Sequence, residues 1–168
     1  MAGSIEKRRM ANLPATVLFK HLEGSSRWTE GQMLADIEKL YARLLTRYVR
    51  NPRSDKEKPL WVILRDLPVY KRGKKACLTD FQVNGGVHFH PIIAIPPADM
   101  CRPGVGLKRL LGQRQEDFFV RGTNISTFHV KRVTGDIDDV VDYALKQLGR
   151  GNATRDDLII LPRAVREL

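Results

Sequence analysis

The sequence predicts an α+β fold in which helices lie on the faces of a central antiparallel β-sheet. Short apolar runs bounded by turn residues recur along the chain, as is typical of strands. The segment 83–86 has the composition of a tight hairpin turn between two such runs, and hairpins join antiparallel neighbours. Only two long segments, after Thr29 and after Asp136, have the apolar spacing of an amphipathic helix.

Length and charge indicate one domain with a polyanionic partner. The chain has 168 residues, enough to bury one core, and 29 Lys and Arg against 19 Asp and Glu give a formal net charge of +10. This balance favours nucleic acid over a membrane surface, and no apolar run approaches the length of about 20 residues that spans a bilayer. Cys77 and Cys101 lack a zinc-binding spacing, so we expect two reduced thiols.

The first half is expected to contain a strand, a long helix and a second strand, at 15–20, after Thr29 and at 60–64. Thr29 and Gln32 match a capping box at the start of the helix, and Asn51-Pro52 ends it. The helix has one broad apolar stripe, which makes its two tyrosines structural: Met33, Leu34, Ile37, Leu40, Tyr41, Leu44, Leu45 and Tyr48.

The second half is expected to alternate strands with two shorter helices. Strands are expected at 77–82, 86–95, 117–121 and 126–133, with an extra strand or a partner contact at 158–161. A short helix is expected around 107–111 and a last helix at about 137–148, with Asp136 as its N-cap. We therefore divide the chain into a mobile basic arm (1–14), one domain (15–150) and a tail that packs on it (151–168).

Two histidines flank one apolar residue in the strand at 86–95. Side chains of a strand alternate between faces, so His88 and His90 point the same way while Phe89 points to the other face. Such a pair can hold one divalent metal ion, although two half-buried histidines bonded to their neighbours fit the same pattern. Pro91 cannot donate a hydrogen bond, which predicts an edge, a bulge or a local break here.

Tyr143 and Lys146 lie one turn apart on the last helix, on the side opposite its apolar stripe. A free tyrosine hydroxyl with a pKa of about 10 is a weak nucleophile at neutral pH, and a nearby cation lowers that pKa. Tyr143 is therefore a candidate nucleophile assisted by Lys146. A surface tyrosine on an amphipathic helix is the alternative.

Together, the histidine strand (His88-Phe89-His90) and the later helix motif (143–146, Tyr-Ala-Leu-Lys) resemble the HUH endonuclease superfamily. The order of the two motifs resembles the single-tyrosine replication-initiator (Rep) branch of rolling-circle plasmids and single-stranded-DNA viruses. In the relaxase branch, the nucleophile lies near the N-terminus instead. The resemblance covers roughly residues 15–150 and implies a ferredoxin-related sandwich, with an antiparallel sheet flanked by helices on both faces.

The resemblance also implies a metal site and its ligands. His88 and His90 would bind Mg²⁺ or Mn²⁺ together with one acidic or amide side chain. In Reps that third ligand commonly lies on the strand paired with the histidine strand, which implies Asp80, with Gln82 as the substitute on the same face. Asp is a departure, because Glu is common at this position.

The implied activity is site-specific cleavage and rejoining of single-stranded DNA at a hairpin or origin site. Tyr143 would attack the phosphate and leave a 5′-phosphotyrosine and a free 3′-hydroxyl, while Lys146 would activate Tyr143 or hold the phosphate. Such nicking initiates rolling-circle replication or mobile-element transfer. The expected location is the cytoplasm of a prokaryotic cell or mobile-element host, or the nucleus if the host is eukaryotic.

Several side chains outside the two motifs are candidate DNA contacts or supports of the site. His129 shares a strand face with Lys131 and is a candidate to support the metal ligands or to contact DNA, although a plain strand histidine fits the pattern better. The sequence has no P-loop, so strand separation would come from supercoiling or a host helicase. The candidate backbone contacts are basic residues: Lys71, Arg72, Lys74, Lys75, Lys108, Arg109, Arg114 and Lys131.

Two other function classes fit the same residues. One is a metal-dependent hydrolase in which His88, His90 and Asp80 activate water and no covalent adduct forms. The other is a non-enzymatic nucleic-acid-binding module whose histidines are incidental. The role of Tyr143 distinguishes the first alternative from a tyrosine endonuclease, and metal binding at His88 separates both enzymes from the binding module.

Overall fold

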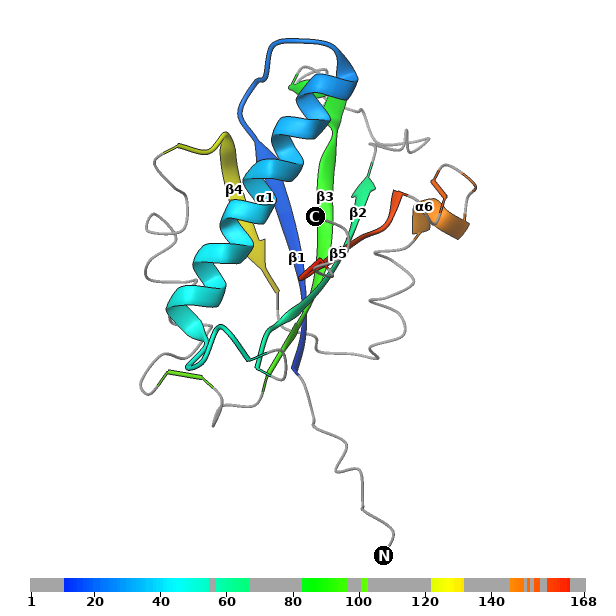
Figure 1. Cartoon of the computed structure of the whole chain (residues 1–168). Coiled ribbons are helices and arrows are strands. Elements are labelled where there is room, and N and C mark those ends of the chain that lie inside the picture. Colours follow the sequence, from blue (N-terminus) through cyan, green and yellow to red (C-terminus); the bar gives the residue numbers. More distant parts are fainter. Residues whose placement is uncertain are drawn as a thin grey trace, which may run out of the picture.

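A computed structural model describes residues 11–54, 57–66, 83–96, 101–102, 122–131, 146–149, 151, 153–154 and 157–163 of the 168-residue chain. The elements in this part of the chain are five strands and two α-helices, with a 3₁₀ turn at Asn84–Gly86. Figure 1 shows how they are arranged. In chain order the strands and helices are β1 (Ala11–Phe19), α1 (Ser26–Tyr48), β2 (Leu60–Asp66), β3 (His88–Ile95), β4 (Ile125–Val130), α6 (Lys146–Gly149) and β5 (Ile159–Leu161).

The five strands form one antiparallel sheet in the order β4-β1-β3-β2-β5. The strand that carries both histidines, β3, is therefore the central strand, between β1 and β2 (Figure 1). This arrangement confirms the α+β fold with a central antiparallel sheet. The tail contributes β5, which pairs with the outer side of β2, and β1 begins at Ala11, inside the segment expected to be a mobile arm.

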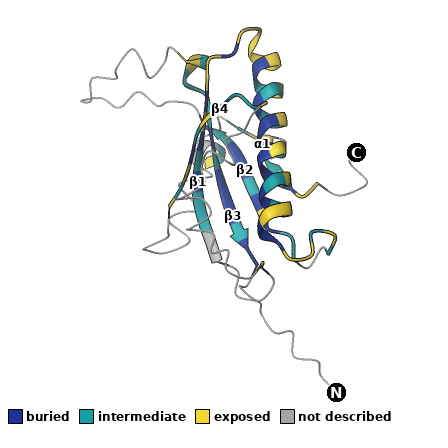
Figure 2. Cartoon of the chain, turned by 90° about the vertical axis from the view of Figure 1, so that its left-hand side faces the viewer, coloured by how far each residue is buried: buried dark blue, intermediate teal, exposed yellow. Residues whose placement is uncertain are grey.

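The long helix α1 lies along one face of the sheet, and Figure 2 shows it beside the strands, with buried residues on the side that faces them. The expected apolar stripe is confirmed, because it supplies six of the eight buried residues of the helix, among them Met33, Ile37, Leu40 and Leu44. On the sheet, Trp61 is completely buried and stacks on Phe128 of β4 at a ring-centroid distance of 6.0 Å. The core therefore fills the layer between α1 and the sheet.

The start of α1 differs from the expected capping box. The helix begins at Ser26, and its N-cap is Ser25 with extended backbone angles (φ −68°, ψ 156°). Thr29 lies inside the helix, where its backbone N–H donates to the carbonyl of Ser25 at 2.9 Å and its hydroxyl donates to the carbonyl of Ser26 at 3.0 Å. A threonine that bonds back into the preceding turn cannot also cap it, so the prediction at Thr29 was wrong by about one turn.

A buried carboxylate ties α1 to the start of β4. Asp36 has a side-chain exposure of 3%, and its Oδ2 accepts hydrogen bonds from the backbone N–H (2.7 Å) and side-chain amide (3.1 Å) of Asn124. The ammonium of Lys39 donates to Oδ1 at 2.9 Å. Because a buried charge needs several partners, this cluster fixes where the chain enters β4 relative to the helix.

Pro91 lies in the central strand and not at an edge of the sheet. On the β2 side it pairs with Ile63 in a continuous ladder. On the β1 side the ladder joins Pro14 to Ile92 and Val17 to Phe89 and is interrupted between these pairs. Proline has no N–H to donate, so the expected local break occurs, on one side of the strand only.

The remaining predicted elements at 77–82, 107–111 and 117–121 lie outside the described residues, as does most of the last helix. Its described end, α6, contacts β2. Neither described helix combines the length and hydrophobicity needed to cross a bilayer. Cys101 is buried, and its thiol donates to the carbonyl of Pro96 at a distance of 3.7 Å, while Cys77 lies outside the described residues.

Candidate metal centre

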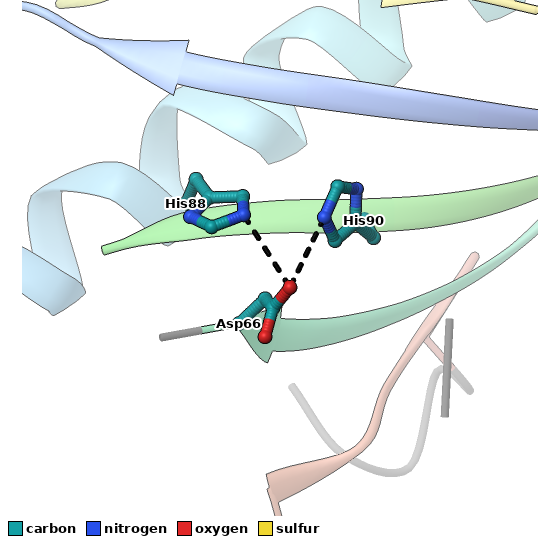
Figure 3. A group of neighbouring side chains, drawn as sticks. All are labelled: Asp66, His88 and His90. Carbon is teal, nitrogen blue, oxygen red and sulfur yellow. Dashed lines mark ion pairs between the residues drawn. The ribbon is translucent and has the colours of Figure 1, made fainter. Parts of the chain in front are cut away.

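Three metal-ligating side chains meet where β2 ends and β3 begins. The strand register places Asp66 opposite His88, and Leu64 opposite His90. The Oδ2 atom of Asp66 lies 3.4 Å from Nε2 of His88 and 3.2 Å from Nε2 of His90, as the dashed lines in Figure 3 mark. One carboxylate oxygen and two imidazole nitrogens therefore converge within 4.8 Å of one another.

The three side chains of the cluster are largely buried but remain partly accessible to solvent. The side-chain exposures are 4% for Asp66, 13% for His90 and 21% for His88. The alternation of β3 explains why both imidazoles lie on one face, while Phe89 is buried with α1 on the other. The two rings meet edge to face, with centroids 4.8 Å apart. Asp66 is therefore held close to the sheet, while His88 is the most accessible of the three ligands.

The other ring nitrogen of each histidine is directed at the backbone. Nδ1 of His88 lies 2.9 Å from the carbonyl oxygen of Gly86, and a carbonyl only accepts, so Nδ1 carries the proton. The unprotonated Nε2 of a neutral ring then presents its lone pair to the Asp66 carboxylate. A lone pair and an anion repel each other, so this contact needs a cation between them, either a proton on Nε2, which makes it an ion pair, or a metal ion.

His90 is anchored where the β1–β3 ladder is interrupted. Its Nδ1 lies 3.4 Å from the carbonyl oxygen of Ala15 and 3.3 Å from the hydroxyl oxygen of Thr16. Both contacts are longer than the bond made by His88, so they orient the ring more loosely. The break opposite Pro91 thus lies where β1 supplies polar atoms to the second histidine.

The donor set fits a divalent metal ion. Ligand bonds of about 2.0–2.2 Å to oxygen or nitrogen place neighbouring ligands about 3.0–3.4 Å apart, and the two Asp66–His distances of 3.4 and 3.2 Å agree with this spacing. Backbone bonds at the remote ring nitrogen are also the usual support of metal-binding histidines. The residues that would hold the ion are Asp66, His88 and His90.

The turn before β3 positions His88 through its neighbour Gly86. Asn84 adopts φ 54°, a left-handed conformation that asparagine tolerates better than most residues. The side chain of Asn84 accepts a hydrogen bond from the backbone N–H of Leu22 and donates one to the carbonyl of Lys20, both at 2.8 Å. The turn is thereby fixed to the loop that follows β1.

A cleft of about 520 Å³ opens beside His88, at the end of the sheet where β1 ends and β3 begins. The residues that line it come from β1, β4 and the segment before β3: Thr16, Leu18, Phe19, Val83, Gly86, Val87, His88 and Ser126. None of these side chains is acidic, so an anionic molecule can enter next to the metal ligands without direct charge repulsion from the cleft walls.

The two tyrosines of α1 are structural, as expected. Tyr41 is buried and its hydroxyl donates to the carbonyl of Pro59 at 3.0 Å. Burial raises the pKa of Tyr41, and burial together with a hydrogen bond to Cys101 raises the pKa of Tyr48. A higher pKa leaves less phenolate at neutral pH, so neither hydroxyl is suited to nucleophilic attack.

The structure brings together some of the predicted site residues and adds one. His88 and His90 meet, as expected, while Asp80, Gln82 and Tyr143 lie outside the described residues. The backbone of Lys146 lies in α6, next to β2. The carboxylate at the two histidines belongs to Asp66, which the sequence analysis missed.

Of the candidate DNA contacts, only Lys131 is described, and it is exposed just after β4. The positions of Lys71, Arg72, Lys74, Lys75, Lys108, Arg109 and Arg114 lie outside the described residues. His129 is exposed on β4 and pairs with Thr16, so β1 separates it from the histidine strand. It is not a member of the metal-ligand cluster.

A signal for Asp66 is present in the sequence. Asp66 continues the alternation of β2 beyond Leu64, on the same face, in a strand whose apolar run ends just before it. What the sequence does not reveal is that β2 pairs with β3, because a long connection separates the two strands. A comparison with protein-family models, curated proteins and solved structures found no match for this chain.

Proposed function

We propose that this chain is a metal-dependent endonuclease that nicks single-stranded DNA and retains the cut strand on Tyr143. The observation that carries the proposal is the convergence of Asp66, His88 and His90 at a sheltered point beside an open cleft. The net charge of +10 favours a polyanionic substrate. The order of the histidine strand and the Tyr143–Lys146 motif, similar to that of Rep proteins, supports a tyrosine nucleophile.

The ligand atoms also favour a particular class of ion. Two imidazoles with one carboxylate suit a first-row transition metal better than Mg²⁺, which prefers oxygen ligands, so Mn²⁺ is the expected cofactor and Mg²⁺ the weaker substitute. A bound divalent ion would supply positive charge that polarises the scissile phosphate. Asp66 and the backbone-anchored ring of His88 would keep the ligand atoms in place.

The proposed reaction exchanges one phosphate ester for another. The hydroxyl oxygen of Tyr143 attacks phosphorus, and the bond from phosphorus to the 3′-oxygen of the preceding nucleotide breaks. The tyrosine proton is released and the departing 3′-oxygen takes up a proton, so no water is consumed. The same steps in reverse rejoin a strand, as initiation of rolling-circle replication or transfer of a mobile element requires.

The test is a search for a covalent protein–DNA adduct. We expect a mixed-sequence pool of labelled single-stranded DNA with Mn²⁺ to give a labelled protein band on a denaturing gel. EDTA and Tyr143→Phe should each abolish it, while Tyr41→Phe, which removes a buried hydroxyl bonded to the carbonyl of Pro59, should retain it in whatever fraction of the protein folds.

Other outcomes point to the other function classes. One such outcome is that the protein cuts DNA without forming an adduct, and that this cleavage persists in Tyr143→Phe but is lost in His88→Ala. That result would indicate metal-dependent hydrolysis and not the tyrosine mechanism. DNA binding without Mn²⁺ binding, measured by calorimetry, would leave only a nucleic-acid-binding module.

A further inference from the structure

The cleft beside His88 has the chemistry of a binding site for a partly apolar group. Leu18 and Val83 have exposures of 40% and 42%, which makes them two of the few large apolar side chains of the described chain that face solvent. Both line the cleft, together with Phe19 and Val87. Exposed apolar walls with a few polar groups are typical of ligand sites, and 520 Å³ lies within their usual range of about 300–1,000 Å³.

Hydroxyl groups and a metal ligand complete the walls. Thr16 of β1 and Ser126 of β4 line the cleft from neighbouring strands. His88 belongs both to the cleft and to the metal-ligand cluster. A molecule in the cleft therefore lies directly beside the atoms that would hold the ion.

One class of occupant meets all of these conditions. The bases of a duplex are stacked and paired, so their faces cannot enter between Leu18 and Val83, whereas an unpaired base can present its face to apolar walls and its edge to hydroxyls. The phosphate attached to that base carries the negative charge that the neighbouring metal site attracts.

We propose that the cleft binds one unpaired nucleotide that flanks the scissile phosphate, with its base between Leu18 and Val83. This inference rests on the proposed function, because it assumes that a DNA phosphate lies at the Asp66–His88–His90 cluster. It adds a site that holds the strand by a base, independently of the metal ion.

The test measures binding without cleavage. Fluorescence anisotropy of a labelled, mixed-sequence 20-nucleotide DNA in EDTA is compared for Leu18→Glu and Leu60→Glu. Leu60 of β2 does not line the cleft, and its exposure of 41% is close to the 40% of Leu18. The two variants therefore introduce the same charge at equally exposed strand positions, inside and outside the cleft. We expect Leu18→Glu to weaken binding about 10-fold or more, and Leu60→Glu about 2-fold at most.

Three results would overturn the proposal. The first is that both variants weaken DNA binding equally, and the second is that the wild-type protein binds an abasic strand as tightly as the normal strand. The third is that the wild-type protein binds Mn²⁺ but no DNA. If Leu18→Glu does not fold, as judged by thermal unfolding, Val83→Glu, at the other exposed apolar residue that lines the cleft, replaces it. Retained Mn²⁺ binding and adduct formation would show that failure concerns the cleft and not the proposed function.

Discussion

At the scale of single residues, the candidate metal site depends on a carboxylate that belongs to a different strand from the histidines. Asp66 is 4% exposed, and the same Oδ2 atom faces both Nε2 atoms. A carboxylate in this position offsets the charge of a bound ion and needs only a small movement to ligate it. It is also the feature that separates a metal site from two histidines that merely share a strand face.

We expect Asp66→Ala to lower Mn²⁺ affinity by at least about 100-fold, because even partners outside the ligand set change affinity by about 10–100-fold. Isothermal titration calorimetry measures the affinity directly. Glu38→Ala removes a carboxylate on α1, the helix that covers the sheet face opposite to the cluster. This variant should bind Mn²⁺ like the wild type. If Asp80→Ala abolishes binding and Asp66→Ala does not, the ligand implied by the family resemblance is correct and the geometric assignment is wrong.

Residue patterns predicted the site in part. The alternation of β3 was sufficient to place His88 and His90 on one face, because alternation is a local property of the strand. Asp66 was missed because its contact with them depends on which strands pair, and no local pattern encodes that pairing across a long connection. Thr29 was misjudged for a different, local reason, since Ser25, one turn earlier, occupies the N-cap position.

At the scale of elements, the turn Asn84–Gly86 connects the fold to the metal ligands. The carbonyl of Gly86 accepts from His88, and Asn84 ties the same turn to the backbone after β1. Three successive residues of the turn have positive φ, at 54°, 62° and 77°. The turn is therefore held by side-chain bonds and not by backbone preference alone.

We expect Asn84→Gly to reduce Mn²⁺ affinity by about 10-fold, because it keeps the left-handed backbone accessible but removes both amide bonds that fix the turn. Asn84→Ala should reduce the affinity further, since alanine adds strain at positive φ. Asn51→Gly, in the loop after α1, serves as the matched control. Wild-type affinity in Asn84→Gly would mean that the amide bonds do not position His88.

The attachment of α1 to β4 gives a second prediction at this scale. Asp36→Ala should lower the free energy of unfolding by about 3 kcal/mol, because the amide groups of Asn124 lose their charged acceptor. Lys39→Ala should cost less than about 1 kcal/mol, since that ammonium is 52% exposed. Urea unfolding followed by circular dichroism measures both, and equal losses would show that the ion pair, not the bonds to Asn124, is the important contact.

At the scale of the whole molecule, the antiparallel sheet brings distant parts of the chain together at one end of its strands. The ends of β1 and β2 meet the starts of β3 and β4 there. The metal-ligand candidates (Figure 3), the turn and the cleft all lie at this end of the sheet. The fold class could be predicted because it follows from local patterns, whereas the strand order that assembles the site depends on pairings between distant segments.

The charge of the whole chain predicts how DNA binding responds to salt. A strand that contacts about five phosphates releases counterions with a slope of about −0.7 per phosphate, so raising the salt from about 50 to 200 mM should weaken binding about 100-fold. Anisotropy of the 20-nucleotide DNA in EDTA measures the slope, and an uncharged DNA analogue of the same sequence should bind with little dependence on salt. If the basic side chains behind the net charge of +10 contact phosphates, DNA binding must depend strongly on the salt concentration. A slope near zero would therefore mean that the base-binding cleft, and not the basic side chains, supplies the affinity for DNA.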